Sequence, residues 1–327
     1  MKDDDLPPPP GSISPEAQAY FAATFSREAR DSAWHPAPDD PEGWVEYNCL
    51  ALAEREALND ELRLRYPADL IETSLGGVPV VDIRPAGWRD DGRLVVYTHG
   101  GGYVGGVASD ALDSTLPIAT ETGLRIVSVS YTLAPHARYE QVTDEACAVI
   151  EALVRAGTPL ARMAVLGDSA GGGLAAATAL KLRDRGIGLP AGLALWSPWT
   201  DLTGSGDSYL TLAHAEPFYR YDRLLAAART CYVGDGDPRH PYASPLFGDF
   251  TKGFPETLIQ VGTRELLLSD SVRLARALDE AGQAVTLDVY EGMWHVFQFK
   301  PIDMPEAALA RRRTGAFLNR VLGRPAP

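Results

Sequence analysis

The stretch MAVLGDSAGG (residues 163–172) decides the fold, because it joins a short apolar run to a serine held between glycines. The run 163–166 predicts a buried strand, and residues 174–185 predict the helix that follows it. The flanking glycines, 167 and 171, allow a sharp turn that exposes the hydroxyl of Ser169 at a helix N-terminus. Free N–H groups and the helix dipole favour developing negative charge there. The pattern G-x-S-x-G therefore predicts a nucleophilic serine.

A second glycine motif, HGGGY at residues 99–103, directly follows the apolar run 94–98. Glycine amides have no side chain in the way, so we expect Gly101 and Gly102 to present N–H groups to an oxyanion. The N–H of Ala170, which follows the serine, is the third predicted donor. No P-loop lysine follows these glycines, which argues against a phosphate-binding loop. Together the two motifs predict a serine hydrolase site with an oxyanion hole.

Short apolar runs alternate with amphipathic segments after residue 70. This alternation is typical of an α/β protein with a mostly parallel sheet and helices on both faces. Strands are expected at residues 78–83, 94–98, 125–129, 163–166, 193–196, 258–261 and 285–290. Helices are expected between and after them at residues 110–121, 141–155, 174–185, 270–281 and 305–322.

Two segments fall outside this alternation. Residues 1–70 form an N-terminal extension, in which 1–12 are expected to be extended or mobile and 41–65 to be one helix, and we interpret this extension as a helical cap. The catalytic domain then spans 71–327. Within it, residues 200–254 hold many aromatics and turn residues, so we expect a cap insertion over the carboxyl ends of the strands, where such sheets bind ligands.

A serine nucleophile needs a base, and the base needs an acid that orients it. In the hydrolase chain order the acid and then the histidine follow the serine. His295 lies in the loop after the last expected strand and is the predicted base. For the acid we favour Glu265, which follows the strand 258–261, over Asp270, which is expected to cap the next helix. Asp270 remains the alternative acid.

The two glycine motifs resemble those of the hormone-sensitive-lipase-like family of α/β-hydrolases, the GDxG esterases, and so do YTLAP at 131–135, SPWTDL at 197–202 and ASPL at 243–246. The resemblance covers roughly residues 75–320. It implies an α/β-hydrolase fold with Ser169 as nucleophile, His295 as base and the three N–H donors named above. The family most often has an aspartate where this chain has Glu265. The resemblance also implies a homodimer formed through the last strand and helix.

Composition and charge narrow the possible partners. The 327 residues include 30 Lys and Arg against 44 Asp and Glu, which gives a net charge of −14. A negative field of this size repels phosphate backbones and anionic membrane surfaces, so neither nucleic acid nor a membrane is an expected partner. Cys49, Cys147 and Cys231 are far apart and odd in number, which predicts neither a disulfide framework nor a zinc site and fits the cytoplasm. No cofactor and no metal is expected.

These observations predict a serine carboxylic ester hydrolase that acts through an acyl-enzyme on a small-molecule ester. Candidate substrate-binding residues are Tyr103, Trp199, Phe218 and Tyr219. Bulky aromatics in a cap favour short-chain, aryl or otherwise small esters. A lactone hydrolase that uses the same three catalytic residues is the alternative function. A non-catalytic ligand-binding protein with a hydrolase fold is the alternative from a different class.

Overall fold

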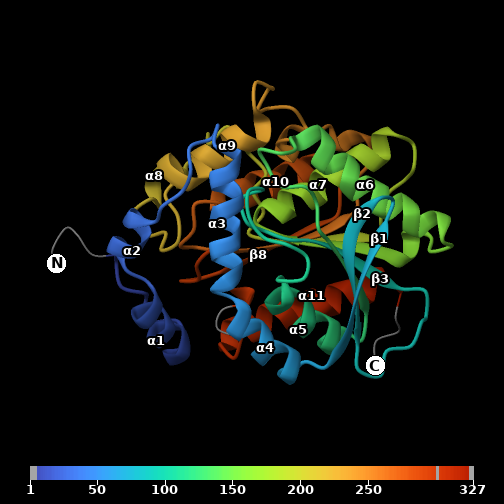
Figure 1. Cartoon of the computed structure of the whole chain (residues 1–327), viewed down its shortest axis with the longest axis horizontal. Helices are drawn as coiled ribbons and strands as arrows, with labels where there is room; N and C mark the ends of the chain where they lie inside the picture. Colours follow the sequence, from blue (N-terminus) through green and yellow to red (C-terminus); the bar gives the residue numbers. More distant parts are fainter. Residues whose placement is uncertain (1–5, 300–301, 324–327) are drawn as a thin grey trace.

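The computed structural model describes residues 6–299 and 302–323, and Figure 1 shows a central sheet with helices above and below it. The described residues form an eight-stranded sheet with the order β1-β2-β4-β3-β5-β6-β7-β8. Strands β3 to β8 are parallel, whereas β2 pairs antiparallel with both β1 and β4. The predicted α/β class with a mostly parallel sheet is confirmed.

The central strands are buried on both faces. Every residue of β3 and β6 is buried, for example, so these strands are continuous apolar runs rather than alternating ones. The strands are β1 (Ala68–Leu75), β2 (Val78–Pro85), β3 (Leu94–Thr98), β4 (Arg125–Val129), β5 (Met163–Asp168), β6 (Gly192–Trp196), β7 (Glu256–Gly262) and β8 (Val285–Tyr290). Because β3 to β8 are parallel, their carboxyl ends meet at one edge of the sheet, where their loops converge.

Helices cover both faces of the sheet (Figure 1). On one face lie α6 (Tyr139–Arg155), α7 (Ala170–Asp184) and α10 (Leu268–Glu280); on the other lie α5 (Leu112–Thr122) and α11 (Pro305–Val321). Each layer has its own buried apolar cluster, with Leu174 and Leu274 in the first and Leu116 and Leu318 in the second. The sheet is therefore held between two separate cores.

Four helices precede the sheet: α1 (Pro15–Thr24), α2 (Arg27–Ser32), α3 (Pro41–Ala53) and α4 (Glu56–Arg65). The prediction of a single helix over 41–65 is wrong, because the chain turns between α3 and α4. There the N–H of Arg55 bonds to the carbonyl of Leu52, three residues back, at 3.1 Å. The Arg55 side chain then pairs with Asp110 and Asp113 near the start of α5, which fixes the direction of the turn.

The segment between β6 and β7 contains only short helices. They are α8 (Ser208–Thr211), the π-helical turn η2 (Tyr221–Leu225), α9 (Ala226–Val233), and the 3-10 turns η3 (Pro245–Phe247) and η4 (Phe250–Lys252). This segment contacts the N-terminal helices. The thiol of Cys231 in α9 lies 3.4 Å from the carbonyl of Pro38, and the guanidinium of Arg30 donates to the carbonyl of Glu216 at 2.7 Å.

Strand β1 was not predicted. It forms a hairpin with β2 in a register that runs from Ala68 opposite Pro85 to Leu75 opposite Val78. All of its residues are exposed or half-buried, and the sequence has neither the apolar run of a buried strand nor a clear alternation. Backbone pairing at the edge of the sheet, rather than burial of side chains, defines this strand.

The segment before α1 is extended and packs against two loops at the carboxyl edge of the sheet; residues 1–5 lie outside the described residues. The guanidinium of Arg264 donates to the carbonyl of Pro8 at 3.0 Å and also to the carbonyl of Pro7. The hydroxyl of Ser12 donates to Glu291 at 2.7 Å. Of the two expectations for this segment, extended or mobile, the extended one describes residues 7–12, which are bound to the loops after β7 and β8.

Candidate active site

Ser169 occupies a sharp turn between β5 and α7. Its backbone has φ 54° and ψ −122°, a conformation that L-residues adopt only when their surroundings enforce it. A Cβ at Gly171 would lie 2.0 Å from the carbonyl oxygen of Thr98, and one at Gly167 would lie 2.3 Å from the carbonyl oxygen of Gly171. Only glycine fits at these two positions, and the close approach places the Ser169 hydroxyl at the N-terminus of α7.

The structure brings together Ser169, His295 and Glu265, which lie far apart in the sequence. The Nε2 atom of His295 is 2.9 Å from Oγ of Ser169, and its Nδ1 atom is 2.8 Å from Oε2 of Glu265. Glu265 is completely buried and His295 is 6% exposed. A serine, an imidazole and a carboxylate in this order form the relay that acyl transfer requires.

The second oxygen of Glu265 is held by two further donors. Oε1 accepts from the N–H of Gly262 at 2.6 Å and from the hydroxyl of Ser197 at 2.9 Å. The Ser197 oxygen in turn accepts from the N–H of Val296 at 3.0 Å, next to His295. Ser197 thus joins the loop of the acid to the loop of the histidine. From the sequence, this serine was only the first residue of the SPWTDL motif and had no assigned role, because its side-chain partners Glu265 and Val296 lie 68 and 99 residues away.

Opposing effects act on the pKa of His295. Burial lowers this pKa, but the hydrogen bond and the negative charge of Glu265, together with the charge of Glu216, outweigh burial and raise it above the usual value. A raised pKa makes the imidazole a stronger acceptor for the Ser169 proton, and it also means that the imidazole is protonated at low pH.

Glu216 is a buried carboxyl beside this relay that the sequence analysis missed. Its two oxygens accept from the N–H of Phe218 at 2.8 Å and from the N–H of Leu266 at 3.2 Å. Burial raises the pKa of Glu216 to about 7, and the charge of His295 opposes that rise. In the sequence, Glu216 is one of several acids in the segment between β6 and β7 and has no distinguishing neighbour, so only the folded chain shows its place.

We expect the substitution Glu216→Gln to shift the rising limb of the kcat/KM profile to lower pH. The charge of Glu216 raises the pKa of His295, so its removal lowers that pKa, and the neutral imidazole that acts as base then persists at lower pH. The measurement is kcat/KM for one ester between pH 5 and 9. Glu145→Gln is the matched control, because that carboxylate also accepts from a backbone N–H, that of Thr132 at 2.7 Å. An unchanged limb in Glu216→Gln would contradict the expectation.

Asp270, the alternative acid, bonds to a different loop. It lies in the first turn of α10, and one carboxylate oxygen accepts from the N–H groups of Thr200 and Asp201 at 2.9 and 2.8 Å. The expectation that Asp270 caps its own helix is wrong, because Leu267 is the N-cap residue and the carboxyl points to the loop after β6. Burial, with the nearby charge of Asp201, raises the pKa of Asp270 to about 8. Asp270 is thus mainly a neutral group at pH 7 and has no bond to His295.

We expect Asp270→Asn to weaken the pH dependence of stability. In the wild type, the folded chain holds a proton on Asp270 up to about pH 8, whereas an unfolded aspartate loses it near pH 4. The free energy of unfolding therefore falls as pH rises between these values, by at most about 1.4 kcal/mol per pH unit. Urea unfolding at pH 5, 6, 7 and 8 measures the slope, and equal slopes in both proteins would contradict the pKa of Asp270. We also expect kcat to stay within about tenfold of wild type.

The glycine loop after β3 lies beside Ser169. Gly101 and Gly102 have φ of 108° and 63° and line the same cavity as Ser169, while Ala170 is the first residue of α7. Within the described chain, the N–H groups of these three residues donate to no other residue. A Cβ at Gly101 would lie 2.2 Å from the carbonyl oxygen of Gly105, so the loop can turn this tightly only with glycine.

Two buried side chains hold this loop in place. Asp168 accepts from the N–H of Gly100 at 3.1 Å and also from the hydroxyl of Tyr97. The Nδ1 atom of His99 lies 2.7 Å from the carbonyl oxygen of Gly100, and the His99 ring stacks on Tyr131 at 4.2 Å. Burial lowers the pKa of His99 to about 4, so its imidazole is neutral at pH 7 and donates this bond. His99 therefore positions the loop.

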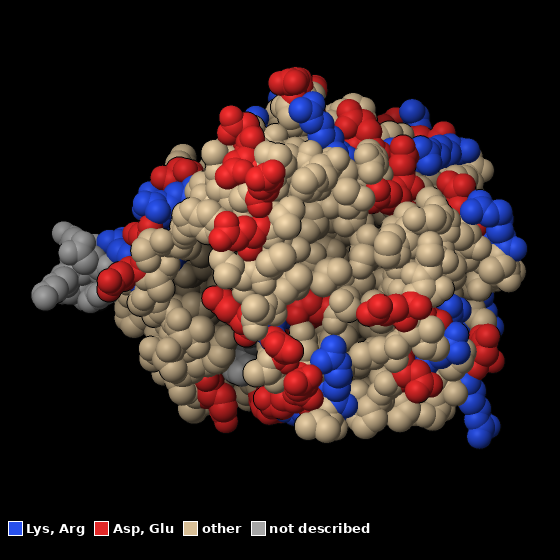
Figure 2. All heavy atoms as spheres, in the orientation of Figure 1, with Lys and Arg blue, Asp and Glu red and all other residues tan. Residues whose placement is uncertain are grey.

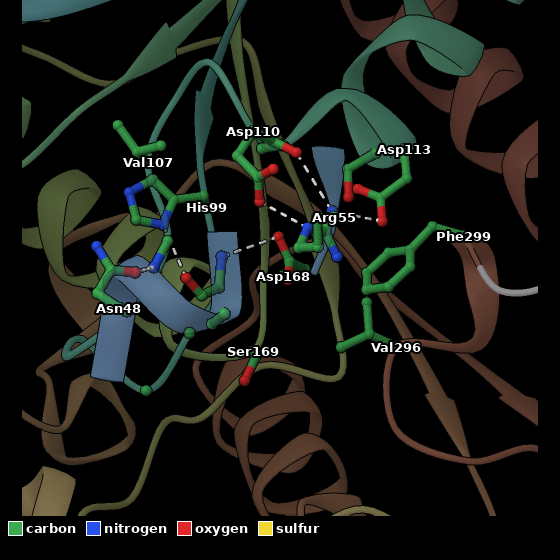
Figure 3. A pocket seen from close by; sticks show the side chains of 18 of the residues that line it. Asn48, Arg55, His99, Val107, Asp110, Asp113, Asp168, Ser169, Val296 and Phe299 are labelled. Carbon is green, nitrogen blue, oxygen red and sulfur yellow. Dashed lines mark hydrogen bonds and ion pairs between the residues drawn. The ribbon is translucent and has the colours of Figure 1, made fainter. Parts of the chain in front are cut away.

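A cavity of about 250 Å³ opens at Ser169. Figure 3 shows Ser169 at one side of it, with Val296 and Phe299 on the same side as Asp113, and Asn48 and His99 opposite. Phe218 and Tyr219 line the cavity as predicted, and the Tyr219 ring meets the His295 ring edge-on at 5.5 Å. Helix α3 supplies part of the wall through Tyr47, Asn48, Ala51 and Leu52.

Tyr103 and Trp199, the other two predicted substrate-binding residues, do not line this cavity. Tyr103 has φ 66° and stacks on Tyr232 at 3.6 Å, whereas Trp199 is completely buried 6.0 Å from Tyr103. The turn of the glycine loop directs Tyr103 into the core beneath it. We therefore correct the sequence-based assignment, because both side chains pack in the core instead of facing a ligand.

Within residues 6–299 and 302–323 no group of three or more His, Cys, Asp or Glu side chains is arranged to hold a metal ion. None of the helices in these ranges is long and apolar enough to cross a membrane.

Known proteins are similar to this chain in sequence and in structure. The family model for the alpha/beta hydrolase fold matches residues 95–299. An acetyl-hydrolase from Streptomyces hygroscopicus is 35% identical over 257 residues, which cover 79% of this chain and 84% of the relative. An esterase from Acinetobacter venetianus is 33% identical over 243 residues, which cover 71% and 80%.

A crystal structure of an esterase from the bacterial hormone-sensitive lipase family has a TM-score of 0.81 and 32% identity to this chain, covering 95% of this chain and 100% of that one. These similarities confirm the α/β-hydrolase fold, the family resemblance and the predicted class of ester hydrolase. The chain belongs to the hormone-sensitive-lipase-like esterases of the α/β-hydrolase family.

Proposed function

We propose that the chain hydrolyses small carboxylic esters through an acyl-enzyme on Ser169. The observation that carries this proposal is the unbroken sequence of hydrogen bonds from Ser169 through His295 to Glu265, at 2.9 and 2.8 Å. Nε2 of His295 takes the hydroxyl proton as Oγ attacks the ester carbonyl. Glu265 holds the Nδ1–H of the imidazole and stabilises the positive charge that forms on the ring.

The tetrahedral intermediate carries a negative oxygen, for which Gly101, Gly102 and Ala170 are the proposed donors. Their N–H groups make no other bond within the described chain and are therefore free to donate. One such donor lowers the activation barrier by about 2.7–4 kcal/mol. His295 then protonates the leaving alcohol, and water activated by the same imidazole attacks the acyl-enzyme and releases the acid. The imidazole of His295 thus takes part in every proton transfer of the proposed reaction.

The size of the cavity supports short or compact esters. Its volume of about 250 Å³ lies below the range of about 300–1,000 Å³ that is usual for ligand pockets. The acetyl-hydrolase from Streptomyces hygroscopicus is named for the release of a small acyl group, which supports the same size class for this chain. The test is a series of p-nitrophenyl esters from acetate to palmitate. We expect kcat/KM to be highest for acetate to butyrate, and a steady rise from butyrate to palmitate would overturn the size proposal.

Covalent labelling tests the role of Ser169. A fluorophosphonate reacts with a serine only where a base activates it, so we expect one adduct on the peptide that contains Ser169. Labelling should be absent in Ser169→Ala and unchanged in Ser74→Ala, because Ser74 is exposed on β1. A protein that is folded but unlabelled would instead be a ligand-binding member of the fold.

We also propose that α1 to α4 and residues 200–254 form one cap over the carboxyl edge of the sheet. Both segments supply walls of the cavity, through Tyr47 and Leu52 from the first and Phe218 and Leu225 from the second. The substitution Leu52→Trp tests the cap, because it enlarges one wall residue and leaves the helices in place. We expect KM for butyrate esters to rise more than KM for acetate esters, and an equal change would contradict the proposal.

We also propose a cytoplasmic location and a homodimer. Cys49, Cys147 and Cys231 are free thiols, and Cys147 and Cys231 are buried, which supports a reducing, cytoplasmic environment. Strand β8 forms one edge of the sheet, with Val289 45% exposed, which supports a homodimer through this edge. Light scattering at micromolar concentration, compared with Val289→Lys, distinguishes dimer from monomer.

A further inference from the structure

The cavity beside Ser169 has a charged end formed by Arg55, Asp110 and Asp113. Nε of Arg55 lies 2.6 Å from Oδ2 of Asp110, and Nη2 lies 2.8 Å from Oδ2 of Asp113. Figure 3 shows this cluster beyond Asp168 as seen from Ser169, with Phe299 at its side. All three side chains line the cavity, so a substrate that fills the cavity meets them.

This cluster retains hydrogen-bonding capacity. Arg55 has five N–H donors. Its three hydrogen bonds to described residues come from Nε and Nη2, so Nη1 donates to none of the described residues. The Oδ1 atom of Asp113 likewise accepts from no other described residue. Arg55 is 23% exposed in its side chain, and Asp113 is 2% exposed. A ligand in the cavity can therefore find both a donor and an acceptor at this end.

The charges of the cluster determine which ligand fits. One guanidinium stands against two carboxylates, which leaves an excess of acceptors. The surface around the cluster is negative as well. Figure 2 shows acidic side chains gathered over α3 and α4, the helices that meet at Arg55. An anionic group would be repelled, and an alkyl chain would remove water from the charges without replacing its hydrogen bonds. A hydroxyl group both donates to a carboxylate and accepts from a guanidinium.

We propose that the natural substrate is an ester with hydroxyl groups away from the scissile bond, and that Arg55 and Asp113 select it by bonding those hydroxyls. The inference rests on the proposed ester hydrolysis at Ser169 and adds the substrate class. It assigns a binding role to a pair that also ties the turn between α3 and α4 to α5. A purely structural ion pair would hold that turn equally well without facing the cavity.

Matched substrate pairs test the proposal. The first pair is glycerol 1-acetate and 2-methylbutyl acetate, in which methyl groups replace both hydroxyls. The second is ethyl 3-hydroxybutyrate and ethyl 3-methylbutyrate, which moves the hydroxyl to the acyl side. We expect kcat/KM to favour the hydroxylated ester by about tenfold or more in at least one pair, because an unpaired polar wall penalises the apolar analogue. Ratios near one or below in both pairs would overturn the proposal.

Two variants show whether the cluster causes the preference. We expect Asp113→Asn to bring the ratio of the preferred pair towards one. Arg55→Met is the second variant and serves if the first does not fold. Asp82→Asn is the matched control. Asp82, like Asp113, is a buried acid in an ion pair, here with Arg84 and Arg125, but it does not line the cavity. A preference that persists in both cluster variants would overturn the assignment.

A third pair separates hydroxyl selection from cation selection. Acetylcholine and 3,3-dimethylbutyl acetate have the same shape and differ in one positive charge. A preference for acetylcholine without one in the hydroxyl pairs would overturn the proposal in favour of a cationic substrate. Loss of all ester hydrolysis, with no fluorophosphonate adduct on Ser169, would instead contradict the proposed function itself. An enzyme that is active and labelled, but whose kcat/KM is equal for the hydroxylated and the apolar ester of each pair, contradicts only the proposed substrate class.

Discussion

Replacing Ser169 by alanine is expected to lower kcat by about four to six orders of magnitude. The substitution removes the oxygen that lies 2.9 Å from Nε2 of His295, so no acyl-enzyme forms. The cavity, the glycine loop and the free N–H groups stay in place, because Cβ of alanine adds nothing to the turn. The activity that remains should come from oxyanion stabilisation and binding alone. Initial rates with p-nitrophenyl acetate, and the loss of any pre-steady-state burst, measure this result.

The control for this prediction is structural. Ser169→Ala should keep the far-ultraviolet spectrum and the unfolding midpoint of the wild type, since the strained backbone at φ 54° is no harder for alanine than for serine. A folded variant that retained more than about a hundredth of wild-type kcat would show that another group attacks the ester, and the proposed mechanism would be wrong.

Replacing Glu265 by glutamine should be the second largest loss, about three to four orders of magnitude in kcat. The reason is the pair of donors on Oε1. The N–H of Gly262 and the hydroxyl of Ser197 both donate to that atom, so the amide oxygen of glutamine must take its place. The amide NH₂ then faces Nδ1 of His295 and donates to it. The imidazole is forced into the tautomer with its proton on Nε2, where it cannot accept the proton of Ser169.

Glu265→Asp is the informative comparison for this result. Aspartate keeps the charge and cannot donate to Nδ1, but its side chain is shorter by one methylene, so the 2.8 Å contact lengthens unless the loop moves. We expect its kcat to lie between those of the wild type and Glu265→Gln. If Asp270→Asn lost as much activity as Glu265→Gln, the assignment of the acid would be wrong.

The parts of the site that the sequence predicted are those that local backbone chemistry fixes. Ser169 follows a buried strand and precedes a helix. A Cβ added at either flanking glycine would lie only 2.0 to 2.3 Å from backbone oxygens, so no other residue fits there. His295 and Glu265 each follow a strand of a parallel sheet. Because such strands end at one edge, chain order alone indicated that the two loops would meet.

The parts that the sequence did not predict depend on contacts between distant segments. Glu216 is distinguished only in the folded chain, where it accepts from the N–H of Leu266, next to Glu265, and where its charge raises the pKa of His295. Tyr103 is an aromatic residue beside the glycine motif, as a pocket residue could be, but the left-handed turn of the glycine loop directs its ring onto Tyr232. Arg55 lies at the turn that separates α3 from α4, where its side chain pairs with Asp110 and Asp113 near the start of α5. In each case the deciding partner lies tens to hundreds of residues away.

The bonds from Arg264 to the carbonyls of Pro7 and Pro8 have a practical consequence for anyone who expresses this protein. Arg264 is the immediate neighbour of Glu265, and Ser12 is bonded to Glu291, in the loop that leads to His295. An affinity tag fused directly ahead of these prolines, or a shortened amino end, would disturb both loops at once. A loss of turnover after trimming the first dozen residues should therefore not be read as damage to the fold.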